Sequence, residues 1–386
     1  MGILRGQLSC FWNKVSGTLF PRLEETIGPL TEKHRKFVAI LEMARVEEFV
    51  RNSNGMPWRP AKDRAQIGRA FVGKMVYNLD TTRSLMDRLE SDPRFKQICG
   101  WDPEAPLPSE SKFSRVFAEF ATAQLPARIH EALIHRTHSD RLVGHVSRDG
   151  TEIEARERPA PKAKAKKDQP KRKRGRPKEG EQPPPREPTR LEQQLDWSLE
   201  QCLEELPKSC DVGTKRNSKG YKETWIGYSL HMDTADGDIP ISCVLTSASL
   251  HDSQVAIPLA KMTDTRITNL YDLMDSAYDA APIKNYSAAL GHVPIVDINP
   301  RANTTLKKEL TQEAKRVRNI GFKMPKAVRY NQRSSAERVN GRLKDEFEDA
   351  ISVFAAMERY FVISCLAFWH SRLINYCGLF RRMQDE

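Results

Sequence analysis

The chain has 386 residues, a length typical of two or three domains with a buried core. Its net charge is +11, but residues 156–178 hold twelve Lys or Arg against two acidic residues and so contribute +10 of it. This one basic segment favours a polyanion as binding partner. The sequence contains neither a run of about 18 apolar residues nor a signal-type region, which argues against a membrane protein or a secreted one.

Seven cysteines are scattered at positions 10, 99, 202, 210, 243, 365 and 377, with no CxxC pair. An odd set without regular spacing fits reduced thiols better than a disulfide framework or a zinc site. We therefore expect a soluble, cytoplasmic protein.

The first part of the chain predicts helices. Residues 1–30 show no clear pattern and are expected to form an N-terminal arm. Across 31–140, apolar residues recur at helical spacing and predict helices over about 31–52 and 63–79, around 85–89, after a capping Ser109, and around 129–134. Short helices with brief turns permit a helix-turn-helix DNA-binding domain, with Lys112 and Arg115 exposed on its recognition helix. A plain helical bundle fits the pattern equally well.

After residue 141 the period changes to that of a strand, which ends at Asp149; residues 151–155 either continue it or pair back. Residues 157–190 are rich in Lys, Arg, Pro and Ala, and we expect a disordered basic insertion. Within it, the stretch 173–178 resembles an AT-hook, whose Arg174 and Arg176 would lie in the minor groove of DNA. An unspecific polybasic linker is the alternative.

The remaining chain predicts a mixed sheet. A helical segment at 191–206 precedes a hairpin of strands 224–232 and 239–246, followed by strands 268–274 and 293–298, with helices near 251–259, 279–290 and 306–317. This order predicts an α/β catalytic core of 141–156 and 191–355, with helices on both faces of the sheet. A strongly apolar C-terminal helix is expected within 356–386.

The stretch 330–344 predicts a helix with two distinct faces. An apolar stripe can anchor it, and four polar side chains fall within an arc of about 60° on another face. The stripe is Ala336, Val339, Leu343 and Phe347, and the polar set is Tyr330, Arg333, Glu337 and Lys344. A solvated face with an Arg333–Glu337 pair is the simpler interpretation of this stretch alone.

Three acids could form a metal site. Asp149 and Asp275 each end a predicted strand, and Glu337 lies on the helix just described. Carboxylates placed together repel one another unless cations share the site. Two Mg²⁺ ions about 3.5–4 Å apart, or Mn²⁺ in their place, would satisfy three carboxylates and support phosphodiester hydrolysis and transesterification.

With their spacing, these residues resemble the DDE transposases of bacterial insertion sequences. Tyr330, Arg333, Glu337 and Lys344 match that family's Y-(2)-R-(3)-E-(6)-K signature at every interval. Two further motifs agree, Asp275 followed by Tyr278, and the run 148–151 around Asp149. The segments 79–83, 100–101 and 108–109 also look like that group's, so the resemblance spans roughly 35–375 outside the basic insertion.

The resemblance implies a ribonuclease-H-like core, a divalent metal, and cleavage and joining of transposon ends. On this basis Asp149, Asp275 and Glu337 would be the catalytic metal ligands, while Tyr330, Arg333 and Lys344 would hold phosphates or terminal bases. The implied partners are double-stranded DNA, both terminal inverted repeats and target, and a second copy of the chain in a synaptic homodimer. The implied place is the bacterial cytoplasm, in association with the nucleoid.

The chain departs from the family in one respect. Only 61 residues separate Asp275 from Glu337, so a large strand-rich insertion found there in some members is absent, and the insertion lies between the first two acids instead. Asp272 and Asp279 compete with Asp275 for its role, and Asp297 ends another predicted strand. Two other functions fit the same sequence: a catalytically silent DNA-binding protein, and a metal-dependent nuclease without strand joining.

Overall fold

The N-terminal part of the protein is helical. The computed structural model describes residues 15–50, 63–155, 157–161, 188–216, 220–321 and 323–354, with the backbone alone at 15–16 and 346–354. Its first elements are η1 (Val15–Leu19), α2 (Phe20–Ile27), α3 (Glu32–Ala44), α4 (Val46–Phe49), α5 (Arg64–Val76), α6 (Thr82–Ser91), α7 (Pro93–Cys99), α8 (Glu110–Thr122) and α9 (Leu125–His138). The helix expected over 31–52 is divided because Arg45 adopts a left-handed conformation, with φ of 45°.

Two other details of this part differ from expectation. The described portion of the expected arm is helical, and Phe20 and Leu30 pack on Val38 and Ala39 of α3. Ser109 stands at the start of α8, but its side chain makes no capping hydrogen bond and contacts Ser111 Oγ at 3.1 Å instead.

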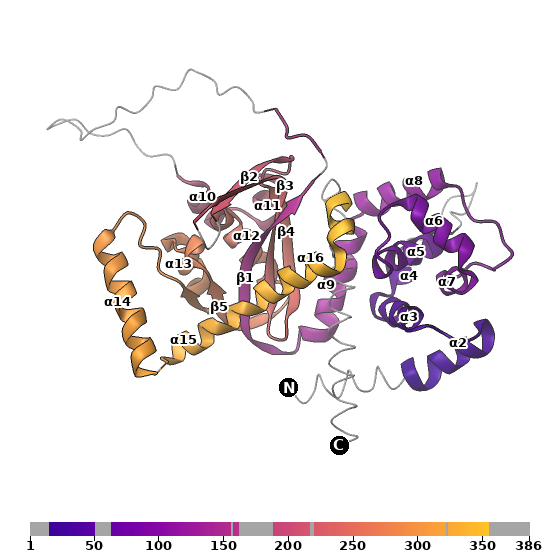
Figure 1. Ribbon diagram of the computed structural model, residues 1–386, viewed down its shortest axis with the longest axis horizontal. Helices are drawn as coiled ribbons and strands as arrows, with labels where there is room; N and C mark the ends of the chain where they lie inside the picture. The colour runs from indigo at the N-terminus through magenta and orange to yellow at the C-terminus, as the bar shows by residue number, and fades with distance from the viewer. Residues whose placement is uncertain are drawn as a thin grey trace.

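A mixed six-stranded sheet forms the second part (Figure 1). Its strands are β1 (Leu142–Glu154), β2 (Asp211–Arg216), β3 (Lys222–Ala235), β4 (Ile239–Ser247), β5 (Thr268–Met274) and β6 (Val293–Val296). The order is β2-β3-β1-β5-β6, with β4 also on β3; β1 pairs antiparallel with β3 and parallel with β5. This confirms the predicted α/β sheet. The first strand does not end at Asp149: of the two alternatives for residues 151–155, continuation of the strand is confirmed, because β3 pairs with β1 as far as Glu154.

One edge of the long strand β3 pairs with two different strands in succession. Residues 222–227 pair with β2, and residues 228–235 pair with β4. Gly227 stands at the change of partner with φ of 150°, and a Cβ there would lie 2.1 Å from the carbonyl oxygen of Ile153. Only glycine permits this close approach of backbones.

Helices cover both faces of the sheet. One face carries α10 (Arg190–Asp196), α11 (Leu199–Glu204), η2 (Asp252–Val255), α12 (Ala256–Asp264), η3 (Ser276–Tyr278) and α13 (Ala281–Ala289). The other is crossed by α16 (Ser334–Phe354), which lies in front of β1 in Figure 1. There, Ile153, Tyr228, Val339 and Leu343 belong to the same hydrophobic cluster as the core of α3–α9. The helical part and the sheet therefore share one core.

The predicted helix over 330–344 is in fact three elements. Tyr330 ends α15 (Pro325–Tyr330), Arg333 lies in η4 (Asn331–Arg333), and Glu337 lies in the first turn of α16. The break occurs beside β1: Ser147 Oγ donates to the carbonyl of Gln332 at 3.3 Å and accepts from Ser335 Oγ at 3.0 Å. Three members of the apolar stripe are confirmed, since Ala336, Val339 and Leu343 are buried; the side chain of the fourth, Phe347, lies outside the described part of the structure.

Some predictions fall outside the described residues. These are the AT-hook-like Arg174 and Arg176 and the C-terminal helix expected within 356–386. Among the helices that the structure describes, none is long and apolar enough to cross a membrane.

Candidate active site

Two of the predicted acids are neighbours at the carboxyl end of β5. Arg148 lies opposite Met274 in the parallel pairing of β1 with β5, so Asp149 and Asp275 are the next residues on the two strands. Asp275 leaves the sheet here, and its Oδ1 accepts a hydrogen bond from the backbone N–H of Ala277 at 2.9 Å. The sheet register therefore brings together two acids that are 126 positions apart in the sequence.

Helix α16 runs along β1 and is fixed to it by three side-chain contacts. Ser335 donates to Ser147, Asn340 Nδ2 donates to Asp149 Oδ2 at 3.1 Å, and Lys344 Nζ donates to Glu152 Oε1 at 2.6 Å. Because Glu337 lies three residues before Asn340, the helix places it on the side of Asp149, about 60° around the axis from Asn340.

The environment of Asp149 favours its protonated form. Burial raises the pKa of Asp149 to about 7; Arg333 opposes this rise, and the negative charges of Asp275 and Asp252 add to it. Carboxyl groups with a strongly raised pKa are common at functional sites. A nearby cation would stabilise the charged form of such a group and lower its pKa.

Arg333 stands between the first and third predicted acids. Burial lowers its pKa, but Tyr330, Glu337 and Asp149 raise it by more. Its guanidinium forms an ion pair with Glu337, whose side chain is 55% exposed, and lies 5.7 Å from the ring centroid of Tyr330. Burial raises the pKa of Tyr330 to about 12, with Asp297 and Asp275 also contributing. Glu337 is thus paired with Arg333, whose pKa is also raised by Asp149.

Lys344 is held within the protein. It shares Glu152 with Lys215, whose Nζ lies 2.5 Å from Glu152 Oε2. Burial would raise the pKa of Glu152, but these two lysines lower it to about 2. Contact of Lys344 with a phosphate would therefore require it to leave Glu152.

The residues suit a hard cation, although they do not enclose one. Within the described ranges, no three His, Cys, Asp or Glu side chains are close enough together to hold a metal ion. The donors nearest the site are carboxylate oxygens, which Mg²⁺ prefers. Two buried polar atoms there, Tyr278 Oη and Asn340 Oδ1, have no hydrogen-bond partner in the described structure. Such atoms are satisfied when water or a hydrated ion enters.

Asp252 is a further acid close to β1, and the sequence prediction did not include it among the candidate site residues. A Cβ on Gly150 would lie 2.9 Å from Asp252 Oδ1, so this carboxylate touches β1 one residue beyond Asp149. Asp252 follows β4 closely, and the sequence pattern there predicts only the start of a helix.

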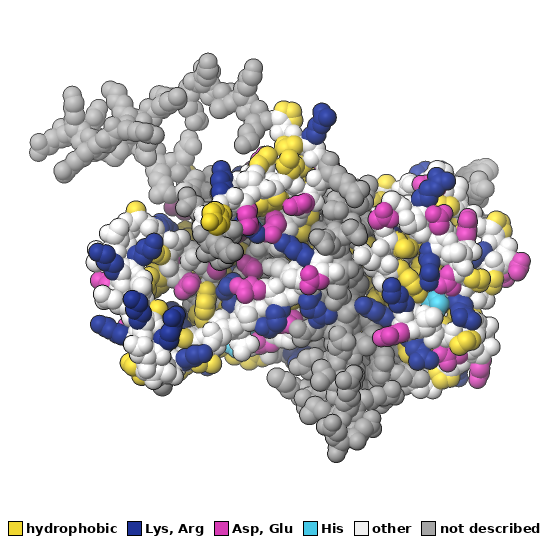
Figure 2. Space-filling model, viewed as in Figure 1, with side chains coloured by type: hydrophobic (Ala, Val, Ile, Leu, Met, Phe, Trp, Pro, Cys, Tyr) yellow, Lys and Arg dark blue, Asp and Glu magenta, His cyan; other side chains and the backbone are white. Residues whose placement is uncertain are grey.

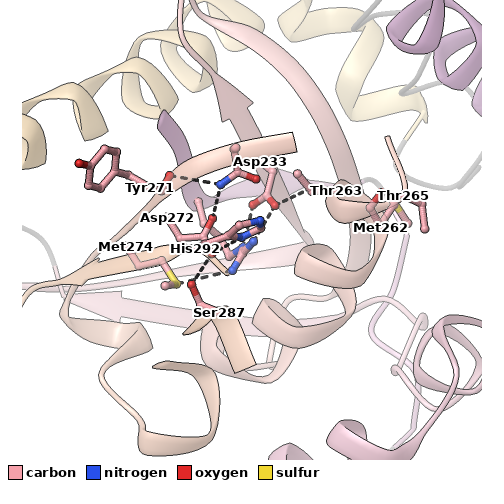
Figure 3. A network of polar contacts seen from close by, with 11 residues as sticks. Asp233, Met262, Thr263, Thr265, Tyr271, Asp272, Met274, Ser287 and His292 are labelled. Atoms are coloured by element: carbon pink, nitrogen blue, oxygen red, sulfur yellow. Dashed lines mark hydrogen bonds and ion pairs between the residues drawn. The ribbon is translucent and has the colours of Figure 1, made fainter. Parts of the chain in front are cut away.

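The competing acids serve other roles. Asp272 lies in a buried polar network (Figure 3), where it accepts hydrogen bonds from Asn269 at 2.9 Å and Ser287 at 2.5 Å. Asp279 forms an ion pair with Lys284 and accepts from the backbone N–H of Asn299 at 2.9 Å. Asp297 contributes to the raised pKa of Tyr330 and so lies on the rim of the site.

The two predicted DNA-contact residues of the N-terminal part, Lys112 and Arg115, differ in their exposure to solvent. Arg115 is exposed on α8 as predicted. Lys112 was also expected to be exposed, but it is half-buried and paired with Asp63 at 2.6 Å. Residues 100–109 form the connection from α7 to α8, which is longer than the three or four residues of a helix-turn-helix. The recognition-helix assignment therefore stays a prediction.

A basic surface not foreseen from the sequence lies on α14 (Thr304–Ile320). No residue of α14 is buried. Lys307, Lys308, Lys315 and Arg318 fall within an arc of about 100° of the helix. Figure 2 shows Lys and Arg side chains gathered over α14 and α15, at the lower left of the molecule.

The sheet order, with Asp149 in β1 beside Asp275 directly after β5, is that of a ribonuclease-H-like domain. Two family models match the chain: Transposase domain (DUF772) over residues 22–119 and Transposase DDE domain over residues 201–368. Together they span more than two thirds of the chain, and it belongs to the DDE transposases of insertion sequences. No curated protein and no solved structure matches it.

The two matched ranges cover only two of the three predicted acids. Asp275 and Glu337 lie within the DDE match, whereas Asp149 lies between the two matches. Members of the family generally depend on a divalent metal and bind DNA.

Proposed function

We propose that the protein cleaves the ends of an insertion sequence and joins them to target DNA in a divalent-metal-dependent reaction. The observation that carries this proposal is the register of β1 with β5, which sets Asp149 beside Asp275 under the helix that bears Glu337. Burying Asp149 beside a second acid lowers the stability of the fold at neutral pH, as its raised pKa of about 7 indicates. Such unfavourable arrangements are found preferentially at functional sites.

Asp149, Asp275 and Glu337 would hold Mg²⁺, two ions in the full assembly, or Mn²⁺ in its place. When bound, the metal supplies charge neutralisation at the phosphate and a more acidic attacking water or hydroxyl. Glu337 would exchange its partner Arg333 for this role, which would free the guanidinium for a DNA phosphate. Asn340 would keep the Asp149 carboxylate oriented through its 3.1 Å hydrogen bond.

DNA binding would use several basic regions. The basic face of α14 leads through α15 to Tyr330 and Arg333, so a duplex lying along it would reach the acids. Arg115, Lys112, Lys344, and Arg174 and Arg176 of the basic insertion would add contacts. Two ends held for joining would require two copies of the chain.

The test is Glu337→Gln, assayed with labelled DNA carrying the terminal repeats of the element. Because the amide keeps the size of the side chain but removes its charge, we expect DNA binding within about threefold of wild type. Mg²⁺-dependent cleavage and strand transfer should fall at least a hundredfold, since a metal ligand is lost.

Glu309→Gln on exposed α14 is the matched control and should leave cleavage unchanged. Normal cleavage by Glu337→Gln would contradict the assignment. A wild-type protein that binds the ends without cutting them would favour the catalytically silent alternative, and cutting without integration into a plasmid would favour the nuclease.

A further inference from the structure

Glu152 lies in β1, three residues beyond Asp149, where one edge of the strand is open. β5 pairs with β1 only as far as Arg148, so no described strand lies beside this edge at Glu152. The Glu152 side chain is 27% exposed. At about 3.3 Å per residue, Glu152 is roughly 10 Å along the strand from Asp149. An anion bound in place of its carboxylate would therefore lie close to the candidate active site.

Two lysines from separate elements meet on the Glu152 carboxylate. Lys344 Nζ of α16 donates to Oε1 at 2.6 Å, and Lys215 Nζ of β2 donates to Oε2 at 2.5 Å. Both lysines stay accessible to solvent, since the side chains of Lys344 and Lys215 are 37% and 42% exposed. Two positive charges share one negative charge, so these three side chains together keep an excess of positive charge.

The backbone holds both lysines in place independently of Glu152. Lys215 lies opposite Glu223 in the antiparallel pairing of β2 with β3. Lys344 directly follows Leu343, which is buried in the core shared with the helical part. One turn earlier on α16, Asn340 is hydrogen-bonded to Asp149. The two ammonium groups are therefore prearranged beside the candidate active site, and another anion could take the place of the carboxylate.

The contacts of the Glu152 carboxylate match those that a phosphodiester would make. Each of its two oxygens accepts from one ammonium group, and the two non-bridging oxygens of a DNA phosphate can do the same. The lysines act strongly on an anion at this place, because they lower the pKa of Glu152 to about 2 although burial would raise it. The family to which the chain belongs binds DNA, which supplies such phosphates.

We propose that Lys215 and Lys344 together bind one phosphate of the DNA backbone, and that Glu152 occupies this pair of lysines in the free protein. The inference rests on the proposed DNA-processing function. It adds Lys215, a residue of β2 outside the Tyr330–Lys344 signature, to the residues that would contact DNA. It also makes Glu152 a competitor that the phosphate must displace, and the open edge of β1 leaves room for this side chain to turn towards water.

The test measures binding of the full-length protein to fluorescent DNA carrying the terminal repeats, by anisotropy in EDTA at several salt concentrations. Lys215→Gln should weaken binding about threefold or more and reduce the salt slope by about 1, because one phosphate contact is lost. Lys215→Arg, which keeps the charge, should bind like wild type. Lys284→Gln is the matched control, since Lys284 is 41% exposed and paired with Asp279 but lies on α13, across the sheet from α16; both quantities should stay unchanged.

Glu152→Gln should have the opposite effect. Because the competing carboxylate is removed, we expect DNA binding to strengthen about threefold. Glu154→Gln removes the same charge two residues further along β1 and controls for the change in total charge. When Lys215 and Lys344 are both replaced by Gln, adding Glu152→Gln should give no larger gain than adding Glu154→Gln.

The outcomes separate this inference from the proposed function. Wild-type affinity and salt slope in Lys215→Gln would refute the phosphate-binding pair, while Mg²⁺-dependent cleavage by the wild-type protein would still support the proposed function. Equal gains from Glu152→Gln and Glu154→Gln in the otherwise wild-type chain would refute the role of Glu152 as competitor. A wild-type protein that fails to bind the terminal DNA would refute the proposed function itself. Circular dichroism of each variant checks folding.

Discussion

Arg148 and Asp149 are consecutive in β1, yet they belong to two contrasting clusters of buried charge. Arg148 makes two hydrogen bonds of 2.7 Å to Asp233, which also accepts one from Thr263 at 2.7 Å (Figure 3). Beside it, Asp272 has three donors. Asp149, by contrast, accepts a hydrogen bond from Asn340 and has two negative charges near it, Asp275 and Asp252, with Arg333 as the opposing cation. The first cluster is satisfied by the protein itself, whereas the second has fewer partners for its buried acid.

The pKa values of Asp272 and Asp149 shift in opposite directions, in agreement with the different numbers of partners in the two clusters. Burial would raise the pKa of Asp272, but His292, Arg148 and Ser287 together lower it. For Asp149, burial outweighs the help of Arg333, and its pKa rises to about 7. The lesson is that burial alone does not make an acid functional; what distinguishes the site is burial without sufficient partners.

Breaking the satisfied cluster should have the largest effect on stability. Arg148→Met leaves Asp233 buried without its cation, and we expect a loss of about 3–5 kcal/mol in the free energy of unfolding. Urea denaturation measures it. The exposed Lys215→Met, which removes one of two partners of Glu152, should cost less than about 1 kcal/mol. Similar losses for the two variants would mean that the buried pair has no special role.

The two clusters should also respond to pH with opposite signs. A folded pKa of about 7, against about 3.9 in the unfolded chain, means that Asp149 stabilises the fold below about pH 4 and that this stability is lost as the pH rises through 7. Relative to wild type in EDTA, Asp149→Asn should therefore gain roughly 2–4 kcal/mol between pH 5 and pH 8.

Asp272 provides the opposite case. Because its folded pKa is lowered, its contribution is present above about pH 4 and disappears as the pH falls through the folded value. The advantage of wild type over Asp272→Asn should shrink from pH 5 to pH 3 in urea titrations. A shift of the same sign for both variants would remove the contrast between the clusters.

Asn340 should give the smallest effect. It links Asp149 to α16, and Asn340→Ala should lower the free energy of unfolding by about 1 kcal/mol, the usual value for one hydrogen bond. Thermal denaturation of the metal-free protein at pH 8 measures it. Asn319→Ala on exposed α14 should stay within about 0.5 kcal/mol of wild type. Equal behaviour of both variants would show that Asn340 does not hold the acid.

The parts of the fold predicted well are those with strong local signals. Strand β5 begins and ends where the sequence predicts, because a short apolar run is followed at once by Asp275. β1 continues past Asp149 and β2 was not predicted, because both depend on pairing with β3, which is distant in sequence. The break at 331–333 likewise follows from Ser147 of β1, which no local pattern of residues 330–344 could show.

The site was predicted in part for the same reason. The sequence pattern finds Asp149 and Asp275 because each follows an apolar run, although Asp149 lies inside β1, and the register of the two strands then places them together. The position of Asp252 beside Gly150 and His231 could not be predicted, since neither glycine nor a buried histidine is unusual in a strand sequence. The ion pair of Glu337 with Arg333 agrees with the simpler interpretation of that helix, and a metal-binding role for Glu337 stays a prediction.

The helices α3–α9, the sheet and α16 share one hydrophobic core, so the helical part cannot be replaced independently of the rest. Val339 and Leu343 of α16 pack in the same cluster as Phe71 and Phe113 of the helical part. Exchanging residues 15–140 for those of a relative would therefore leave cavities or steric clashes against Val339 and Leu343 of α16, unless the apolar face of α16 were exchanged too. The helical part and the sheet domain therefore depend on each other for packing, and recombination between relatives should succeed only when both segments come from the same parent.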